Sequence, residues 1–464
     1  MQLLLLLAVV SAVAISEQAP QQPVSDAWLR AVLACLAMAV APLFAVATSS
    51  MIAGSLRRDF QRKPELLRRF GRLRNVHLAV WFLAAAAVLY LLGWAQLVRF
   101  NWSLDGVFLL DDIATFLPVV VPLVLSWGAF YEVERCLHRH SGKAADDESA
   151  VTRGQYVNLH ARHYLGLLLL PAFAVLAVQD VIRYMGPALP GESEALLLCL
   201  PVGGMLLFFP LALRYIWKTE SLPKGALRDR LMHLCQRAGF RPGDLIVWRT
   251  DRMIVNAAVA GLAPPWRYVF FTDLLLARFD EDEVELILAH EIGHVRHHHL
   301  LDRLLVMALP IALWFVVATA FPQLVSAGSD WLAALGLPVS LQPAAAGPVA
   351  LALYSITVFA AFSRRLEHDA DLFAARACHL GNQHSRQGCH EMADLLEKLA
   401  VVAGMDRDSR SWLHPSIGRR VALLERVAAA PALGDRFEEQ VRWLRRGIFT
   451  AIVAALAYLA IASA

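Results

Sequence analysis

The chain of 464 residues has few charged residues of either sign. Only 18% of the residues are Asp, Glu, Lys or Arg, where an average soluble domain has about 25%, and 58% are apolar. This composition excludes an intrinsically disordered chain and a collagen-like one. The formal net charge of +3 gives no reason to expect a nucleic-acid partner. Together with a mean hydropathy of +0.49, the composition indicates a membrane protein.

Cysteine is also scarce and shows no pattern of bridges. The six cysteines are scattered along the chain, and three of them lie in or beside apolar runs. Such cysteines behave as small buried hydrophobic residues, so a disulfide framework is not expected. The stretch from Cys378 to His390, which also holds His379, His384 and Cys389, has no spacing typical of a zinc finger. We expect a loop between two helices there.

Long apolar runs are abundant. A run of about 17–25 apolar residues can cross the hydrocarbon core of a bilayer. Eight such runs follow residue 25, at Ala31–Ile52, Val76–Val98, Gly106–Phe130, Tyr164–Ile182, Ala195–Trp217, Leu304–Val325, Leu341–Phe362 and Ile448–Ala464. Residues 1–15 are apolar but short, and their Ala12-Val13-Ala14 ending suits cleavage of a signal peptide. A retained short span is the alternative.

Lys and Arg alternate between the loops in a way that predicts the orientation of the chain. The loop after the first run holds eight of them and the loop after the third holds five, whereas residues 326–347 hold none. Because basic loops stay in the cytoplasm, residues 218–303 and 363–446 are expected on that side. The preference for Arg over Lys, with many Ala and Leu, suggests a bacterial source and hence the inner membrane.

A histidine motif follows the fifth apolar run. Asp280 and Glu283 have the spacing of a capping box, so a helix is predicted to begin there. It contains His290-Glu291-Ile292-Gly293-His294, in which the two histidines lie one turn apart and can share one metal ion. Glu291 lies beside that ion, where its carboxylate could take a proton from a bound water molecule. The alternative is an ordinary polar turn on an amphipathic helix.

A pair of acidic residues after the seventh run favours the metal site. A catalytic zinc ion needs three protein ligands and one open position. Glu367 and Asp371 are four residues apart and therefore share a helix face. Glu367 can be the third ligand, and Asp371 can accept the free ring N–H of a ligand histidine. The alternative is an acidic helix face at a membrane exit.

Five ordered motifs between residues 220 and 430 carry a family resemblance. They are Asn256-Ala257, Phe271-Thr272-Asp273-Leu274-Leu275, His290–His294, Ser363-Arg364 with Glu367 and Asp371, and His414-Pro415-Ser416 with Arg420. In these motifs the chain resembles the membrane zinc metallopeptidases that include the HtpX heat-shock protease and the CaaX prenyl endopeptidase.

The resemblance implies a fold, a cofactor and residue roles. The fold would be mainly α: a polytopic membrane protein with a cytoplasmic zincin-type metallopeptidase domain that contains a small β-sheet. One Zn²⁺ per chain would be held by His290, His294 and Glu367, with Glu291 as general base. Asn256 and Ala257 would lie on the edge strand that receives the substrate backbone. His414 would donate a hydrogen bond to the tetrahedral oxyanion.

These expectations divide the chain into six parts. They are a signal peptide or short span at 1–15, five spans in 26–217, a first peptidase part at 218–303, a transmembrane hairpin at 304–362, a second peptidase part at 363–446 and a last span at 447–464. Because both ligand helices adjoin the hairpin, the ion is expected at the cytoplasmic membrane surface. His297, His298 and His299 are expected to extend the metal helix as its basic end.

The expected function is hydrolysis of peptide bonds in membrane or misfolded proteins, with a protein or peptide substrate and the lipid bilayer as partners. One alternative is a processing protease like the CaaX prenyl endopeptidase, because five spans also precede the histidine motif in that branch. A second is a zinc-binding membrane scaffold without activity. A third is a transporter, for which Asp111 and Asp112 in the third apolar run are the best support.

Overall fold

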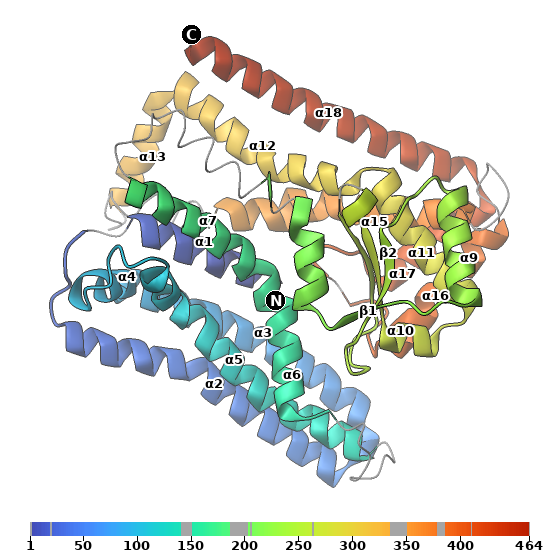
Figure 1. Cartoon of the computed structure of the whole chain (residues 1–464), viewed down its shortest axis with the longest axis horizontal. Helices are drawn as coiled ribbons and strands as arrows, with labels where there is room; N and C mark the ends of the chain where they lie inside the picture. Colours follow the sequence, from blue (N-terminus) through green and yellow to red (C-terminus); the bar gives the residue numbers. More distant parts are fainter. Residues whose placement is uncertain are drawn as a thin grey trace. The chain divides into compact units, whose positions relative to one another are not determined.

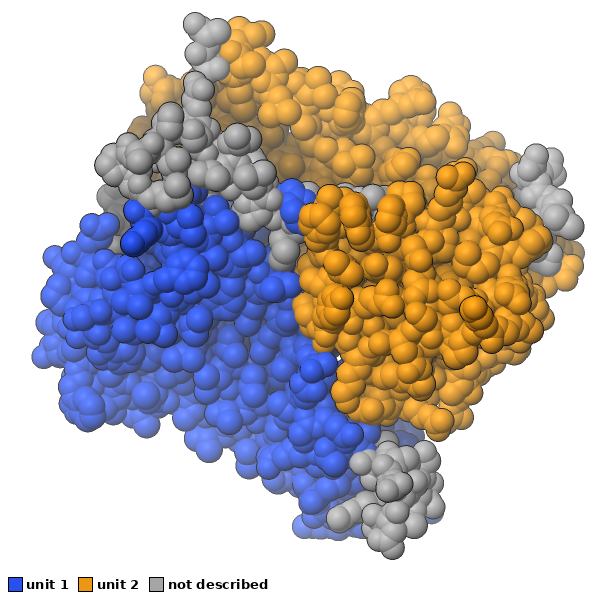
Figure 2. Space-filling model, in the orientation of Figure 1, with its two compact units in different colours: residues 1–206, 332–352 blue, residues 207–331, 353–464 orange. Residues whose placement is uncertain are grey.

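The computed structural model describes residues 2–18, 21–140, 151–185, 203–204, 207–261, 264–334, 350–377, 386–409 and 411–463. The chain forms two compact units, which Figure 2 distinguishes by colour. Unit 1 comprises residues 1–206 and 332–352, and unit 2 comprises residues 207–331 and 353–464. We describe each unit by itself.

Unit 1 is a helical assembly. It contains α1 (Gln2–Gln18), α2 (Ala27–Arg58), α3 (Lys63–Ala86), α4 (Trp94–Gln96), α5 (Leu110–His140), α6 (Arg153–His160) and α7 (Leu167–Met185) (Figure 1). Helix α2 packs against α3 and α5, and the N-terminal helix α1 packs against α3, α5 and α7. The N-terminal apolar segment is thus a helix whose Leu5 and Ala12 are fully buried.

Among the described residues, six helices or continuous helical runs are long and apolar enough to cross a membrane. They are Ala27–Arg58, Phe60–Leu91, Leu110–Leu137, Arg153–Tyr184, His299–Ala320 and Ala432–Ala462. Each contains most of a run that the sequence predicted. The two other predicted runs, Ala195–Trp217 and Leu341–Phe362, lie partly outside the described residues. The predicted class, a mainly helical polytopic protein with a small sheet, is confirmed.

Two predicted boundaries are wrong. The run expected to end at Val98 ends as a helix at Leu91, because the chain turns at Gly93, whose φ of 65° is in the left-handed region. The run expected to end at Val325 ends at Ala320, since Pro322 begins the next helix, α13 (Pro322–Ala334). Apolar composition continues past both points, and so it did not reveal the breaks.

Unit 2 contains a four-stranded sheet. Its order is β1 (Thr219–Ser221), β2 (Asp244–Trp248), β4 (Tyr268–Thr272) and β3 (Ala257–Ala260). Strands β2 and β4 are parallel, and the two outer pairs are antiparallel. Every residue of β4 is buried, as expected for a continuous apolar strand at the centre of a sheet. Strand β3 lies at an edge of the sheet.

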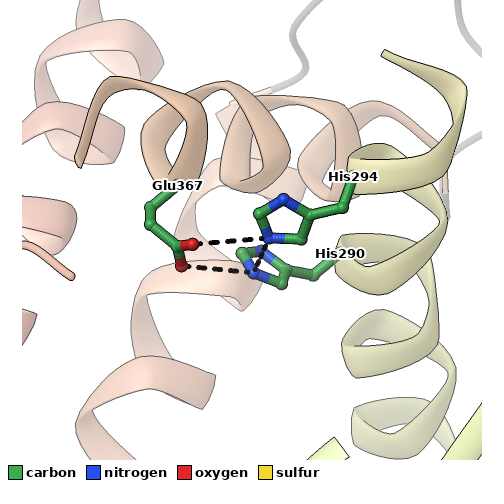
Figure 3. Close-up of side chains that lie close together, drawn as sticks. All are labelled: His290, His294 and Glu367. Atoms are coloured by element: carbon green, nitrogen blue, oxygen red, sulfur yellow. Dashed lines mark hydrogen bonds and ion pairs between the residues drawn. The ribbon is translucent and has the colours of Figure 1, made fainter. Parts of the chain in front are cut away.

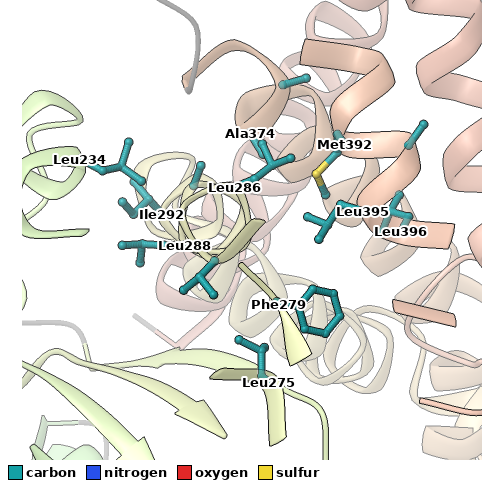
Figure 4. Packing of buried hydrophobic residues seen from close by; sticks show 14 of the residues in the cluster. Leu234, Leu275, Phe279, Leu286, Leu288, Ile292, Ala374, Met392, Leu395 and Leu396 are labelled. Carbon is teal, nitrogen blue, oxygen red and sulfur yellow. The ribbon is translucent and has the colours of Figure 1, made fainter. Parts of the chain in front are cut away.

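Six helices cover the core of unit 2. They are α9 (Ala226–Arg237), α10 (Asp273–Arg278), α11 (Glu281–Arg296), α15 (Ala360–Ala377), α16 (Arg386–Val402) and α17 (Ile417–Ala429). Their buried side chains form one hydrophobic cluster with those of the sheet, part of which is drawn in Figure 4. Met392, Leu395 and Leu396 of α16 and Phe279 are among its members. This cluster fixes α11 and α15 relative to each other.

The remaining helices of unit 2 include candidate membrane spans. Helix α12 (His299–Ala320) packs against α18 (Ala432–Ser463). Helix α15 continues from a helical run that begins at residue 350 and includes the π-helical turn Ser355–Phe359. Val306, Phe359, Leu366 and Val441 from these helices form a second buried cluster. Helix α15, which carries Glu367, is therefore an extension of an apolar helix.

Candidate active site

Helix α11 begins with the predicted capping box. The Asp280 side chain accepts a hydrogen bond from the Glu283 backbone, and the Glu283 side chain accepts one from the Asp280 backbone. The helix ends at Arg296. The prediction that His297–His299 extend it is therefore wrong. His298 has a φ of 58°, which breaks the helix, and His299 is the first residue of α12.

Helices α11 and α15 approach closely at Gly293. A Cβ atom at this position would lie 3.1 Å from the Phe373 ring, closer than side chains normally pack. The missing side chain of Gly293 therefore lets α15 pack against the helix that bears the histidines. This close packing brings Glu367 of α15 to the side chains of His290 and His294 (Figure 3).

The three predicted ligands converge on one point. The Nε2 atoms of His290 and His294 are 3.2 Å apart. Glu367 oxygens lie 3.8 Å from the Nε2 of His290 and 3.6 Å from that of His294. Two ligands of a tetrahedral zinc ion, each at 2.0–2.1 Å, are about 3.3 Å apart. The donor types and the separations therefore fit a zinc ion, with Glu367 almost completely buried.

The electrostatics keep two of these donors in the form that a metal ion needs. Burial holds the pKa of His294 well below its ordinary value, so the imidazole is neutral at pH 7. Burial alone would raise the pKa of Glu367, but the hydrogen bond with His414 and the nearby histidines hold it well below its ordinary value. A neutral imidazole and an ionised carboxylate both offer lone pairs.

Asp371 lies behind His290, as the sequence predicted. Its Oδ1 is 3.0 Å from the Nδ1 of His290, on the side of the ring away from Glu367. Burial would raise the pKa of Asp371, but the Arg420 guanidinium pulls it well below its usual range. The Nε of Arg420 donates to Asp371 Oδ2 at 2.8 Å, and its Nη2 donates to Oδ1. The ionised Asp371 is thus available to the ring of His290.

Glu291 lies between the ligand pair and the sheet. Desolvation raises its pKa to about 6, and the attraction of His290 opposes this rise only in part. The backbone of Val259, in the edge strand β3, is hydrogen-bonded to the carboxylate. A carboxylate with this pKa can accept a proton at neutral pH and release it again.

Two further side chains contact the carboxylate of Glu367. The Nδ1 of His414, a half-exposed residue, lies 2.8 Å from Oε2. The Nη2 of Arg303 donates to Oε1 at 2.8 Å. The structure therefore brings His414 to the site, although its sequence position is far from the other residues. Arg303 is an addition that the sequence did not indicate.

A cavity of about 910 Å³ opens over these residues. Its lining includes Glu291, His414 and the strand segment from Asn256 to Val259. Asn256 immediately precedes β3, and Ala257 is its first residue. The backbone N–H of Thr272 donates to the carbonyl of Asn256, so alternate residues, Ala257 and Val259, direct their backbone groups away from the sheet.

The sequence did not indicate two residues of this site, Asp369 and Arg303. Asp369 of α15 contacts both His297 and His299, and Arg303 contacts Glu367. No spacing rule links these positions, because they meet only when α12 packs beside α15. The loop predicted from Cys378 to His390 is wrong at its C-terminal end, because Cys389 and His390 belong to α16 and Cys389 is completely buried in the core. Residues 378–385 lie outside the described residues. The described cysteines, Cys35, Cys136, Cys235 and Cys389, form no disulfide.

A family model matches the part of the chain that contains this site. Residues 221–428 match the model of peptidase family M48. A protease HtpX homolog of Aeropyrum pernix is 28% identical over 193 residues, which are 40% of this chain and 60% of that relative. The chain therefore spans less than two thirds of that relative's length.

Other relatives are matched over more of their length. A protease HtpX homolog of Desulfotalea psychrophila is 24% identical over 290 residues, 57% of this chain and 99% of the relative. Protease HtpX of a Shewanella strain is 27% identical over 43% of this chain and 72% of the relative. The crystal structure of Ste24p from S. mikatae matches with a TM-score of 0.42 and 17% identity, over 83% of this chain and 98% of that chain.

Proposed function

We propose that this membrane protein is a zinc-dependent endopeptidase of peptidase family M48, because residues 221–428 match the model of that family and the chain is similar to proteases named HtpX. Its substrates would be membrane or misfolded proteins. The observation that carries the proposal is the group of donor atoms from His290, His294 and Glu367, which lie 3.2–3.8 Å apart beside Glu291. The charges and pKa shifts around them support the same assignment.

The proposed ligands of one Zn²⁺ are His290, His294 and Glu367. When bound, the ion would polarise the scissile carbonyl and acidify the attacking water. Asp371 would hold His290 in the tautomer that offers Nε2, because its carboxylate, 3.0 Å from Nδ1, would accept from the Nδ1–H. The Asp371–Arg420 pair thereby positions one ligand without contacting the substrate.

Glu291 would carry the proton transfers, and His414 would stabilise the negative charge of the oxyanion. Glu291 would take a proton from the attacking water and deliver it to the leaving amine, for which a pKa of about 6 is suitable. His414 would donate a hydrogen bond to the oxyanion that forms on the substrate. Its half-exposed position in the cavity lining supports this role.

An extended substrate segment would pair with the edge of the sheet. The backbone groups of Ala257 point away from β4 and are available to a peptide in β-addition. Val259 in the same strand is hydrogen-bonded to Glu291, so a peptide on this edge would pass the general base. Asn256, an exposed residue at the start of the strand, would contact the same peptide.

The test is cleavage of casein by the detergent-purified full chain, run beside the variant Glu291→Gln, with zinc content measured in both. We expect zinc in both proteins and cleavage only by the parent. His294→Ala and Glu367→Ala should lose zinc and cleavage together. Retained zinc in both ligand variants would refute the ligand assignment.

The alternatives predict other results. Zinc without casein cleavage, but with cleavage of a prenylated CaaX peptide, would favour a processing protease. Zinc without cleavage of either substrate would favour a scaffold. For the transporter hypothesis, Asp111 and Asp112 are both ion-paired with Arg99, at 3.1 and 3.4 Å, which offers a structural role for these carboxylates. A parent chain that binds no zinc would favour that hypothesis.

The active site is proposed to face the cytoplasm of a bacterial inner membrane. The support is the alternation of basic loops along the sequence, with eight Lys and Arg residues between positions 57 and 74. Reporter fusions in the segments 218–303 and 363–446 should report the cytoplasm. A periplasmic signal from both segments would refute this orientation.

A further inference from the structure

Behind His294 a chain of hydrogen-bonding groups leads from the proposed metal ligand into α12. The Nδ1 atoms of His294 and His299 are 2.8 Å apart. The Nε2 of His299 is 3.0 Å from Asp369 Oδ2. His299 is completely buried and Asp369 almost so, which means that water does not substitute for either contact. We propose that Asp369 and His299 are positioning residues that hold His294 in its metal-binding tautomer.

The proposal rests on His294 being a zinc ligand and follows from the protons that these atoms can carry. A neutral imidazole has one N–H and one lone pair. If the Nε2 of His294 offers its lone pair to zinc, its Nδ1 carries the proton and donates to His299. The Nδ1 of His299 must then be the acceptor, so its Nε2 carries a proton. That N–H needs an acceptor, and Asp369 provides it.

The same reasoning about ring protons decides whether the neighbouring cluster of His297, His299 and Asp369 is a second metal site. Their donor atoms lie close enough together to hold a second metal ion. A metal on the Nε2 of His299 would move the ring proton of His299 to Nδ1, where it would face the N–H of His294. Two donors 2.8 Å apart repel each other. The cluster is therefore a carboxylate that accepts from two imidazoles, and not a second metal site.

The two histidine ligands are thus supported in different ways. Asp371 contacts the ring of His290 directly and is itself held by Arg420. Asp369 acts on His294 only through His299, which begins the apolar helix α12. Losing an outer partner of a ligand histidine commonly lowers metal affinity by about 10–100-fold. The sequence pattern does not indicate this second support, because it predicts His299 as part of the basic end of α11, whereas His299 begins α12.

The experiment compares two substitutions of His299 in the full chain in detergent. The amide of asparagine reaches the position of Nδ1, so His299→Asn retains an acceptor for His294. The amide of glutamine reaches the position of Nε2, so His299→Gln retains the contact with Asp369 but not the acceptor. The exposed neighbour provides the matched control His298→Asn, because asparagine tolerates the left-handed φ found there.

Zinc affinity is measured by competition with a chromophoric chelator, and the visible spectrum of the Co²⁺-loaded protein reports the ligand geometry. We expect His299→Gln to bind zinc about 10–100-fold more weakly and to change the Co²⁺ spectrum. His299→Asn and His298→Asn should stay close to the parent. Rescue by asparagine separates positioning from a merely structural role, and thermal unfolding checks that all variants are folded.

Three outcomes would overturn the proposal. One is parental zinc affinity and an unchanged Co²⁺ spectrum in His299→Gln. Another is equal weakening in the Asn and Gln variants. A third is a second zinc equivalent that disappears in His297→Ala. A parent that binds no zinc, or binds it equally well in His294→Ala, would instead refute the proposed function on which the inference rests.

Discussion

At the scale of single residues, Asp371 and Arg420 form a buried ion pair behind His290. Removing one partner of such a pair leaves the other as an uncompensated buried charge, which costs about 3–5 kcal/mol. We expect Arg420→Met to lower the free energy of unfolding of unit 2 by this amount and to weaken zinc binding. Denaturant unfolding and chelator competition measure the two effects. The exposed neighbour gives the control Arg419→Met, which should change stability by less than about 0.5 kcal/mol.

The raised pKa of Glu291 predicts how kcat/KM for peptide cleavage falls at acid pH. Its pKa is raised to about 6, and the base must be ionised to accept a proton. As the pH falls through this value the carboxylate becomes protonated, so kcat/KM should decrease below about pH 6. A bound dication would attract the ionised form and move the midpoint lower. A profile whose acid limb is centred above pH 7 would exclude Glu291 as the group that controls it.

The sequence could predict the site residues that share one helix, but not those that tertiary packing brings together. His290 and His294, and likewise Glu367 and Asp371, are four apart on one helix, so their shared faces follow from helix geometry. Arg303 and Asp369 meet the site through tertiary packing, which a one-dimensional pattern does not contain. The sequence predicts His299 in the wrong helix, because nothing in the local sequence indicates the left-handed φ of His298 that separates α11 from α12.

At the scale of elements, Gly293 controls the distance between α11 and α15. Alanine in its place would gain about 1 kcal/mol of helix propensity but would press against Phe373 at 3.1–3.2 Å. Overpacking costs about 1–3 kcal/mol and should also separate Glu367 from the histidines. We therefore expect Gly293→Ala to weaken zinc binding, as measured by chelator competition.

Two variants check this explanation. Gly293→Ala combined with Phe373→Ala should recover much of the zinc affinity, because alanine lacks Cγ and Cδ1, two of the three Phe373 atoms that crowd the new methyl group. Gly447→Ala, in α18, places a methyl group where no atom lies within 4 Å and should leave zinc affinity unchanged. A Gly293→Ala protein with parental affinity would mean that the helices adjust without moving Glu367.

The sequence predicted elements best where local chemistry fixes them. The capping box at Asp280 begins α11 as expected, since it depends only on neighbouring residues. The order of the sheet and the place of β3 at its edge depend on contacts between distant segments. The edge position was expected only from the resemblance to a family, and the strand order was not predicted.

At the scale of the whole molecule, metal binding and folding should be linked. An ion that binds only the folded protein stabilises it by about 2.7 kcal/mol when its free concentration is 100 times Kd. We expect a chelator to abolish cleavage and lower the unfolding temperature of unit 2, and added zinc to restore both. The variant Glu367→Ala should show no dependence on zinc. If the unfolding temperature of the parent also does not depend on zinc, the assignment of the zinc ligands is contradicted.

The short link between α11 and α12 has a consequence for the modularity of this protein. Helix α11 ends at Arg296, α12 begins at His299, and Arg303 of α12 contacts Glu367 of α15. A peptidase domain joined to its membrane spans by a tether could be cut away intact, but here Arg303, in a candidate membrane span, contacts the proposed ligand Glu367. On the proposed function, truncation between α11 and α12 would therefore remove a part of the active site together with the candidate span.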